Sequence, residues 1–461
     1  MSGSLPRFHC NSSLTPSLSE GVKIFFQQAA NRTAAYVRLL VAFVAVLGAD
    51  AAAVALPTVN GTVQYETFGY PDPDRHGPNW ENFFAATVRS HGEITPTLTW
   101  EFEGRAVADD VNFTAGGYSL RNATRRRPYL SLITGAIDYR PSRDLRISVG
   151  KQISNWSTFD EIQPANLMTP RDESDVFRRV ELGIPGVSVH YGSGASFAEL
   201  VVVPLAFTPS RLPQGRWNID QSIALGGSFV ERQDLPPVRL NETQAGARVG
   251  TRLGRLEATV VGYVGRDTAA IFLPGPVLIS IVNGRRKFTP QIIDHFPQLR
   301  AGGITASYPL GDRWLVRTES VYYNSPERDR DDFLHSVAGV ECALDEWRLV
   351  LSYFRDDQTV NATQLVTNKG ERRFFQSFLF GEARYDAGGR LRGHLRTGYD
   401  ATGQFLILQP EVAYRLWRTL WVALLGENIQ ANRPSYAHNK RSYFDATRHE
   451  DRLGTRLEYD F

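Results

Sequence analysis

The last ten residues of the chain alternate between two kinds of side chain. From Arg452 to Phe461, the odd-numbered positions hold Leu, Thr, Leu, Tyr and Phe, whereas the even-numbered positions hold Arg, Gly, Arg, Glu and Asp. Successive side chains of a β-strand point to opposite faces of its sheet. The segment is therefore expected to form a strand with one apolar and one polar face, ending on an aromatic residue.

The same alternation recurs along the chain in segments of about 10 residues, the length of a strand that crosses a membrane. Such segments begin near Ile94, Trp314, Trp347, Leu391 and Leu406, and aromatic residues gather near their ends. Transmembrane β-barrels combine outward apolar side chains, inward polar side chains and aromatic girdles in this way. No window reaches the roughly 18 consecutive apolar residues of a transmembrane helix, which excludes a helical membrane protein. The mean hydropathy of -0.28 averages over the two faces of each strand.

The connections between these segments alternate in length. Short connections are expected at residues 90–93, 141–144, 192–195, 253–255, 309–312, 344–346, 386–390 and 417–419, and long ones at residues 70–80, 104–128, 153–185, 206–241, 266–298, 324–333, 357–373 and 432–450, with a modest one at 400–403. Outer-membrane barrels have short periplasmic turns and long external loops. We therefore expect an all-β, antiparallel up-and-down transmembrane barrel of about 18 strands, with 16 as the alternative, and with both termini in the periplasm. Residues 222–230 could form a strand, but a nineteenth strand would break the alternation, so we place them in a loop.

A signal peptide is expected near the start of the chain. Arg38 precedes the apolar run of residues 39–47 (LLVAFVAVL), and small residues follow it, as in secreted proteins. Cleavage near Ala51 or Ala53 would make residues 1–53 the leader and residues 54–461 a single barrel domain. Residues 1–37 are long for the segment before an apolar run, and we interpret them as a start site assigned too far upstream. Without residues 1–51, basic and acidic residues are equal in number and Cys342 is the one cysteine, which argues against nucleic-acid binding and against a disulfide framework.

One polar segment resembles a known family. Residues 149–156 read VGKQISNW and residues 164–172 read PANLMTPRD, with Asp160 between them. This pattern resembles an uncharacterised family of bacterial outer-membrane channels akin to porins and to the alginate-export channel. Residues 184–185, Pro204 and residues 216–218 continue the resemblance, which covers about 70 residues, and Thr169 stands where the family pattern has Asn. Membership implies a passive or exporter-coupled channel for polar or amphipathic small solutes, with an inner-membrane exporter as an implied partner.

The inward faces of the expected strands carry charges of both signs. The lumen-facing candidates are Arg248, Arg252, Arg317, Glu319, Arg348, Glu382, Arg384, Arg392, Arg396, Glu411, Arg452 and Arg456. Opposed rows of acids and bases across a water-filled pore orient polar solutes, and rings of one sign select ions. Alternatively, these charges pair with neighbouring strands and keep the lumen wet.

The long connection at residues 153–185 is the candidate constriction, because it mixes carboxylates, guanidinium groups and aromatic side chains. If it folds into the barrel, the residues that narrow the pore are expected among Lys151, Trp156, Asp160, Arg171, Asp172, Arg178 and Arg179. The alternative is an exposed external loop. Deleting residues 160–179 should raise the single-channel conductance if the segment narrows the pore.

Other features give weaker expectations. Basic clusters at residues 125–127, 285–287 and 372–373 could contact lipopolysaccharide phosphates or be solvated loops. The stretch at residues 71–77 and the acidic-basic run at residues 327–332 could bind a divalent cation, but neither has the spacing of a calcium loop. Outer-membrane lipid and lipopolysaccharide, and the barrel-assembly machinery acting on Phe461, are the expected partners. A lipid hydrolase or a structural or adhesive barrel are the alternatives to a channel. The motifs G-x-S-x-G, H-E-x-x-H and C-x-x-C do not occur, so we expect no catalytic residue, metal or cofactor.

Overall fold

The computed structural model describes residues 57–71, 79–204, 207–213, 217, 230–282, 285–327, 332–358, 375–402, 404–431 and 451–461. Residues Pro57–Phe461 form one compact unit, and Met1–Leu56 is a separate unit. The expected leader and its apolar run therefore lie outside the described residues. So do the connection at residues 432–450, residues 359–374 with the cluster at 372–373, and residues 222–229.

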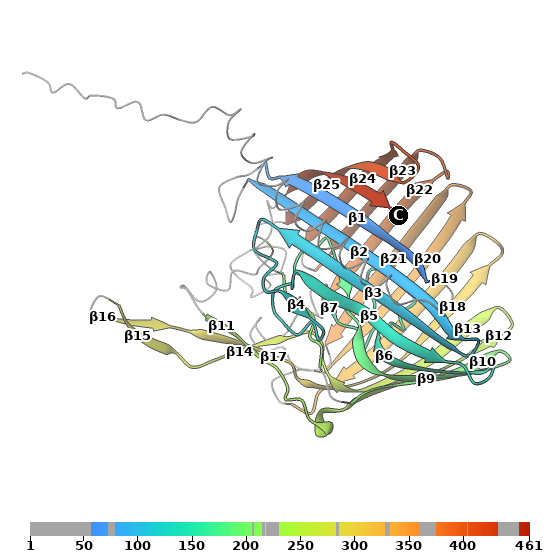
Figure 1. Ribbon diagram of the computed structural model, residues 1–461, viewed down its shortest axis with the longest axis horizontal. Coiled ribbons are helices and arrows are strands. Elements are labelled where there is room, and N and C mark those ends of the chain that lie inside the picture. Colours follow the sequence, from blue (N-terminus) through green and yellow to red (C-terminus); the bar gives the residue numbers. More distant parts are fainter. Residues whose placement is uncertain are drawn as a thin grey trace, which may run out of the picture. The chain divides into compact units, whose positions relative to one another are not determined.

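A closed antiparallel β-barrel dominates the described chain (Figure 1). Its main sheet has 19 strands, of which β4 (Tyr118–Ser119) is a two-residue strand parallel to β5, and the other 18 form the barrel wall. β1 pairs with β26, so the sheet closes on itself and leaves no free edge. The wall strands are β1 (Thr58–Gly69), β2 (Trp80–Thr95), β3 (Leu98–Asp109), β5 (Leu130–Tyr139), β6 (Leu145–Gln152), β9 (Ile184–Ser193), β10 (Ser196–Val203), β12 (Gln244–Leu253), β13 (Leu256–Arg266), β18 (Gln298–Leu310), β19 (Trp314–Asn324), β20 (Phe333–Leu344), β21 (Trp347–Gln358), β22 (Ser377–Asp386), β23 (Leu391–Asp400), β24 (Phe405–Arg415), β25 (Leu420–Ala431) and β26 (Arg452–Asp460). The predicted fold class and the count of 18 strands are confirmed.

The two-residue period of the sequence appears as an inner and an outer face of the wall. In β26, Leu453, Leu457 and Tyr459 are exposed on the outer face, whereas Arg452 is buried inside the barrel. Exposed apolar side chains recur on the outer face of the other strands, among them Val260 and Leu395. An apolar outer face around a charged interior is the arrangement of a transmembrane barrel. In the described part of the chain, no helix is both long and apolar enough to cross a membrane.

Connection lengths alternate between the two ends of the barrel as the sequence predicted, with one error in the placement of a turn. The turn expected at residues 90–93 is wrong: β2 continues to Thr95, and Pro96 and Thr97 make the turn into β3. A register shift between Glu93 and Thr95 absorbs an extra residue. Proline presets the backbone angle of a turn, which explains why the chain reverses there. β3 also runs to Asp109, past the expected strand end at residue 104.

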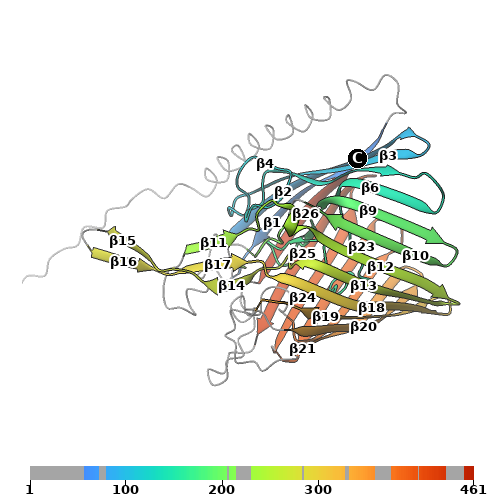
Figure 2. The same ribbon diagram turned by 90° about the horizontal axis from the view of Figure 1, so that it is seen from below.

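Three smaller sheets are not part of the wall. β7 (Arg171–Asp172) pairs with β8 (Val180–Glu181) within the connection between β6 and β9. β11 (Val230–Asp234), β14 (Ile271–Pro274) and β17 (Gln291–His295) form a three-stranded sheet, and β15 (Leu278–Val282) pairs with β16 (Arg285–Thr289) (Figure 2). A short 3-10 helix, η2, spans Leu240–Glu242. Val230, the last residue of the segment placed in a loop, thus begins a strand that is not part of the barrel, and the barrel keeps its 18 strands.

Candidate functional site

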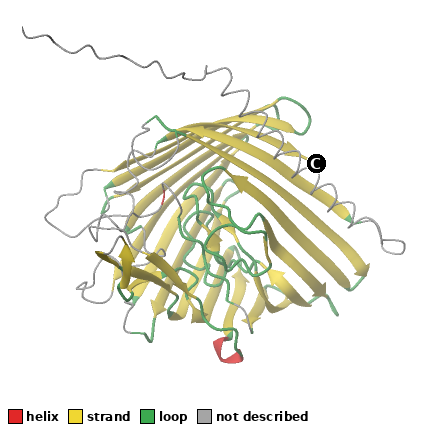
Figure 3. Cartoon of the chain, turned by 60° about the vertical axis from the view of Figure 1, so that its left-hand side comes forward, coloured by secondary structure: helices red, strands yellow, loops and turns green. Residues whose placement is uncertain are grey.

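The connection between β6 and β9, residues 153–183, folds into the barrel, and we call it the lumen loop. Figure 3 shows loop segments inside the ring of wall strands. The first contact that holds the loop is made by Glu319 of β19, which is buried. Its carboxylate accepts hydrogen bonds from the Ser157 hydroxyl at 2.8 Å, from the Thr158 hydroxyl at 2.9 Å and from the Ala165 backbone N–H at 3.1 Å. One buried charge thus fixes both ends of the loop's first turn.

Apolar packing supports the same part of the loop. Trp156, Leu167 and Met168 are buried in a cluster with wall residues such as Val261. Gly246 of β12 faces them, and a Cβ atom placed there would lie 2.6 Å from both the Trp156 ring and the Met168 sulfur. Only glycine leaves room for this contact, so the wall is shaped to receive the loop.

A second anchor connects the middle of the lumen loop to two other connections between wall strands. Asp172 accepts hydrogen bonds from Arg127 at 3.0 Å and from Arg211 at 2.8 Å, and all three side chains are buried. Burial by itself would raise the pKa of the Asp172 carboxyl, but the two guanidinium groups outweigh it and hold that pKa well below its usual range. The carboxylate is therefore ionised at neutral pH, and its role is to join three loops.

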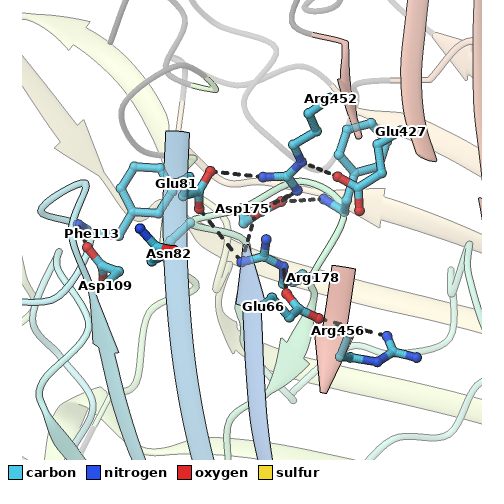
Figure 4. Close-up of polar contacts among 12 residues, drawn as sticks. Glu66, Glu81, Asn82, Asp109, Phe113, Asp175, Arg178, Glu427, Arg452 and Arg456 are labelled. Carbon is cyan, nitrogen blue, oxygen red and sulfur yellow. Dashed lines mark hydrogen bonds and ion pairs between the residues drawn. The ribbon is translucent and has the colours of Figure 1, made fainter. Parts of the chain in front are cut away.

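A third anchor, at the seam where β1 and β26 close the barrel, holds the far side of the loop (Figure 4). Arg452 donates to both oxygens of Asp175, at 2.9 and 3.0 Å, and lies 3.1 Å from Glu81. It also donates to Glu427 of β25. Burial opposes ionisation of Asp175, yet Arg452 and its neighbour Arg178 lower the pKa of Asp175 to about 2. Within this cluster, the loop supplies Asp175 and Arg178 and the wall supplies the rest.

A cavity of about 740 Å³ lies between the lumen loop and the wall. The charged side chains that line it come from both sides: Asp160, Glu161, Arg171, Arg178, Arg179 and Glu181 from the loop, and Glu66, Arg105, Arg348, Arg384, His394, Arg396, Glu411, Glu427 and Arg456 from the wall. Phe177 of the loop and Phe375, Phe378 and Phe380 add aromatic surface. The cavity therefore combines ionic and aromatic contacts.

Ion pairs connect the two sides of this cavity. Arg348 lies 3.2 Å from Asp160 of the loop, and Arg396 lies 3.3 Å from Glu161. Behind them, the buried Glu382 accepts hydrogen bonds from Arg384 at 2.7 Å and from His394 at 2.5 Å. Carboxylates thus hold these wall cations in place at the cavity.

Four of the seven predicted constriction residues line the cavity: Asp160, Arg171, Arg178 and Arg179. The structure places the other three elsewhere. Lys151 donates from its Nζ to the backbone oxygens of Leu120 at 2.7 Å and Leu132 at 2.5 Å, and Trp156 and Asp172 serve the packing and the anchor described above. Trp156 and Asp172 hold the loop, whereas Lys151 ties β6 to β5 and to the connection before it, and none of the three lines the cavity.

The predicted lumen-facing residues divide into three groups. Arg348, Arg384, Arg396, Glu411 and Arg456 line the cavity. Arg317, Glu319 and Arg452 contact the lumen loop, Arg317 through the Thr158 backbone oxygen, and Glu382 orients cavity cations. Arg248, Arg252 and Arg392 form ion pairs with Glu199, Glu257 and Asp386, respectively, away from the cavity.

Several cavity residues escaped the sequence analysis, above all Glu66 and Arg105. In β1 the inner face carries both Glu66 and the fully buried Phe68. Because an apolar side chain lies among polar ones there, the two-residue alternation is hard to recognise in the sequence. Arg105 forms no ion pair within the described residues, although it lines the cavity. Continuing the two-residue alternation through β1 and β3 places both side chains on the inner face.

The other sequence features have different outcomes. Arg127 is buried on Asp172, so residues 125–127 do not present three cations to a surface, whereas residues 285–287 are exposed. Most of the two candidate cation-binding stretches, residues 72–77 and 328–331, lies outside the described residues. Within the described ranges, no group of three or more His, Cys, Asp or Glu side chains could hold a metal ion.

The fold and the lumen loop define a class, a closed 18-stranded transmembrane barrel with an internal loop. No protein-family model and no curated protein match the sequence. Solved structures that are similar in fold include a BenF-like porin from Pseudomonas fluorescens Pf-5 (10% identity, TM-score 0.48, 88% of this chain and 98% of that chain). OccAB3 from Acinetobacter baumannii (12%, 0.47, 88% and 100%) and OpdQ from Pseudomonas aeruginosa (10%, 0.46, 88% and 96%) are further examples. Identity and TM-score this low show similarity of fold and carry no information on function.

Proposed function

We propose that the chain is a channel of the bacterial outer membrane through which small polar solutes cross. The observation that carries this proposal is the charge-lined cavity of about 740 Å³ between the lumen loop and the wall of a closed barrel. Such a cavity accommodates a small molecule and water. The ends with short turns, and with them both termini, are proposed to face the periplasm.

Anions are the preferred solutes in this proposal. Eight arginines and six carboxylates line the cavity, which leaves an excess of positive charge. Arg105 and Arg171 form no ion pair within the described residues, although Arg171 donates a hydrogen bond to Gln163. A narrow passage with low-dielectric walls concentrates ions of the opposite sign. Phe375 and Phe378 offer an apolar surface to the remainder of an amphipathic anion.

Passage is proposed to be passive. The lumen loop is held by Glu319, by Asp172 and by the Asp175–Arg452 pair, so it forms a fixed constriction that a solute passes without an input of energy. An exporter-coupled channel would instead need its partner before solutes could cross. Solute passage through the purified chain, without a partner, therefore distinguishes a passive channel from an exporter-coupled one.

Liposome swelling tests the proposal. The purified chain in liposomes should admit small organic anions faster than cations of equal size, and large sugars should be excluded. Arg396→Gln should reduce this preference, whereas Arg252→Gln, which removes an equal charge outside the cavity, should not. Liposomes that contain folded protein yet admit no solute would contradict a passive channel and favour an exporter-coupled channel or a structural or adhesive barrel.

A lipid hydrolase is the second candidate function. His394 contacts Glu382 and Arg396. Within the described residues it has no serine or threonine hydroxyl partner that it could activate, as a nucleophilic mechanism requires. We therefore propose no enzymatic activity, and lipid-hydrolysis assays on the folded protein should give the rate of empty membranes.

A further inference from the structure

The hairpin of β15 and β16 stands apart from the barrel. Its two strands pair only with each other, and they continue outward from the β14–β17 ladder in the connection between β13 and β18. Figures 1 and 2 both show the hairpin away from the wall, at the end with the long connections. It neither lines the cavity nor contributes to wall pairing.

Large apolar side chains on this hairpin face solvent. Ile279, Ile281 and Phe288 are 63%, 75% and 60% exposed. Ile279 is opposite Phe288 in the ladder, and Ile281 lies two residues along the same strand, so the three share one face. Loops seldom present such a contiguous apolar face unless it contacts something.

The charge of the hairpin has one sign. Arg285, Arg286 and Lys287 are consecutive and exposed, and none of them forms an ion pair within the described residues. No acidic residue occurs between Asp267 and Asp294. Apolar surface combined with uncompensated positive charge is typical of elements that bind membrane surfaces.

We infer that the β15–β16 hairpin docks on a lipid surface that carries phosphate groups. The cations would contact the phosphates, and the isoleucines and Phe288 would enter the acyl boundary. A second copy of the chain fits less well, because Arg286 lies opposite Ile281 on the same face, and joining two such faces would bring the two Arg286 side chains together. This role goes beyond solute passage and uses none of the cavity residues.

Vesicle binding tests the inference. The full chain in phosphatidylcholine nanodiscs is mixed with vesicles of phosphatidylcholine alone or of phosphatidylcholine with phosphatidylglycerol, at low and at high salt, and co-flotation is measured. Binding should require phosphatidylglycerol and weaken with salt. Each cation near an anionic surface contributes about fivefold in affinity, so R285Q/R286Q/K287Q should lose on the order of 100-fold. I279S/I281S/F288S should also bind more weakly but keep its salt dependence.

A matched control removes the same charge elsewhere. R313Q/R390Q/R418Q neutralises three exposed cations in short turns and should bind as the unaltered chain does. Equal losses in the two charge variants, or equal binding to both vesicle types, would overturn the inference. Self-association that depends on Ile279 and Phe288, without vesicle binding, would instead identify a second copy as the occupant. Folding is checked by gel mobility before and after heating, and conductance should be unchanged in every hairpin variant.

Discussion

Replacing Asp175 by Asn should release the lumen loop from the seam of the barrel. The substitution keeps the shape of the side chain but removes the charge that receives two hydrogen bonds from Arg452, at 2.9 and 3.0 Å. Both residues are fully buried, so water cannot replace the lost partner. Breaking a buried ion pair costs about 3–5 kcal/mol. Because Arg452 retains Glu81 and Glu427, we take the lower end, about 3 kcal/mol.

This magnitude sets the expected change in channel behaviour. A loss of about 3 kcal/mol in docking free energy raises the ratio of undocked to docked loop by on the order of 100-fold. In single-channel recordings, Asp175→Asn should therefore show a larger conductance level, or frequent transitions to one, that is rare in the unaltered protein. Glu257→Gln breaks an exposed ion pair with Arg252 and should leave the recordings unchanged. If folded Asp175→Asn gave the same distribution of conductance levels, the seam would not hold the loop.

Three further predictions concern the seam anchor, the cavity and the packing of the lumen loop against the wall. Asp175 has a pKa of about 2 in the folded chain and 3.8 ordinarily, so its contribution to loop docking should persist above about pH 4 and be lost as pH falls toward 2, which recordings across that range would detect. Arg384→Gln combined with Arg396→Gln should lower the anion-to-cation permeability ratio at least about twofold, and an unchanged reversal potential in a salt gradient would refute the anion preference. Gly246→Val would force a side chain into the Trp156–Met168 contact and should destabilise the protein by about 1–3 kcal/mol, measured as a lower temperature at which its gel mobility changes.

The barrel could be predicted because its signals are local. Side-chain alternation is visible within ten residues, and loop lengths can be counted without knowing any contact. The misplaced turn shows where local signals compete: residues 90–93 read SHGE, a plausible turn, but the chain reverses at Pro96 instead. The sequence alone does not determine where a wall strand ends, because the end depends on pairing with the neighbouring strand.

The anchors of the lumen loop were beyond such a prediction. Asp172 was expected at the constriction, but its partners Arg127 and Arg211 are 45 and 39 residues away in the chain. The partner of Asp175 is 277 residues away, on the strand that closes the barrel. A charged residue on a loop can line a cavity or pair with a distant cation, and only the fold decides between the two. Asp160 and Arg179 line the cavity, where Asp160 pairs with Arg348 of β21.

The conductance of a loop deletion tests the central claim most directly. With 18 strands spaced about 4.8 Å apart and tilted by about 40°, the backbone of the wall encloses a diameter of about 36 Å, far wider than the cavity that the loop leaves. Residues 160–179 include Asp172 and Asp175, so their removal eliminates two of the three anchors and most of the obstruction. We predict stepwise conductance for the purified chain in planar bilayers and steps several-fold larger for the folded deletion variant. Steps of equal size, or no steps from correctly folded and inserted protein, would contradict a pore narrowed by the lumen loop.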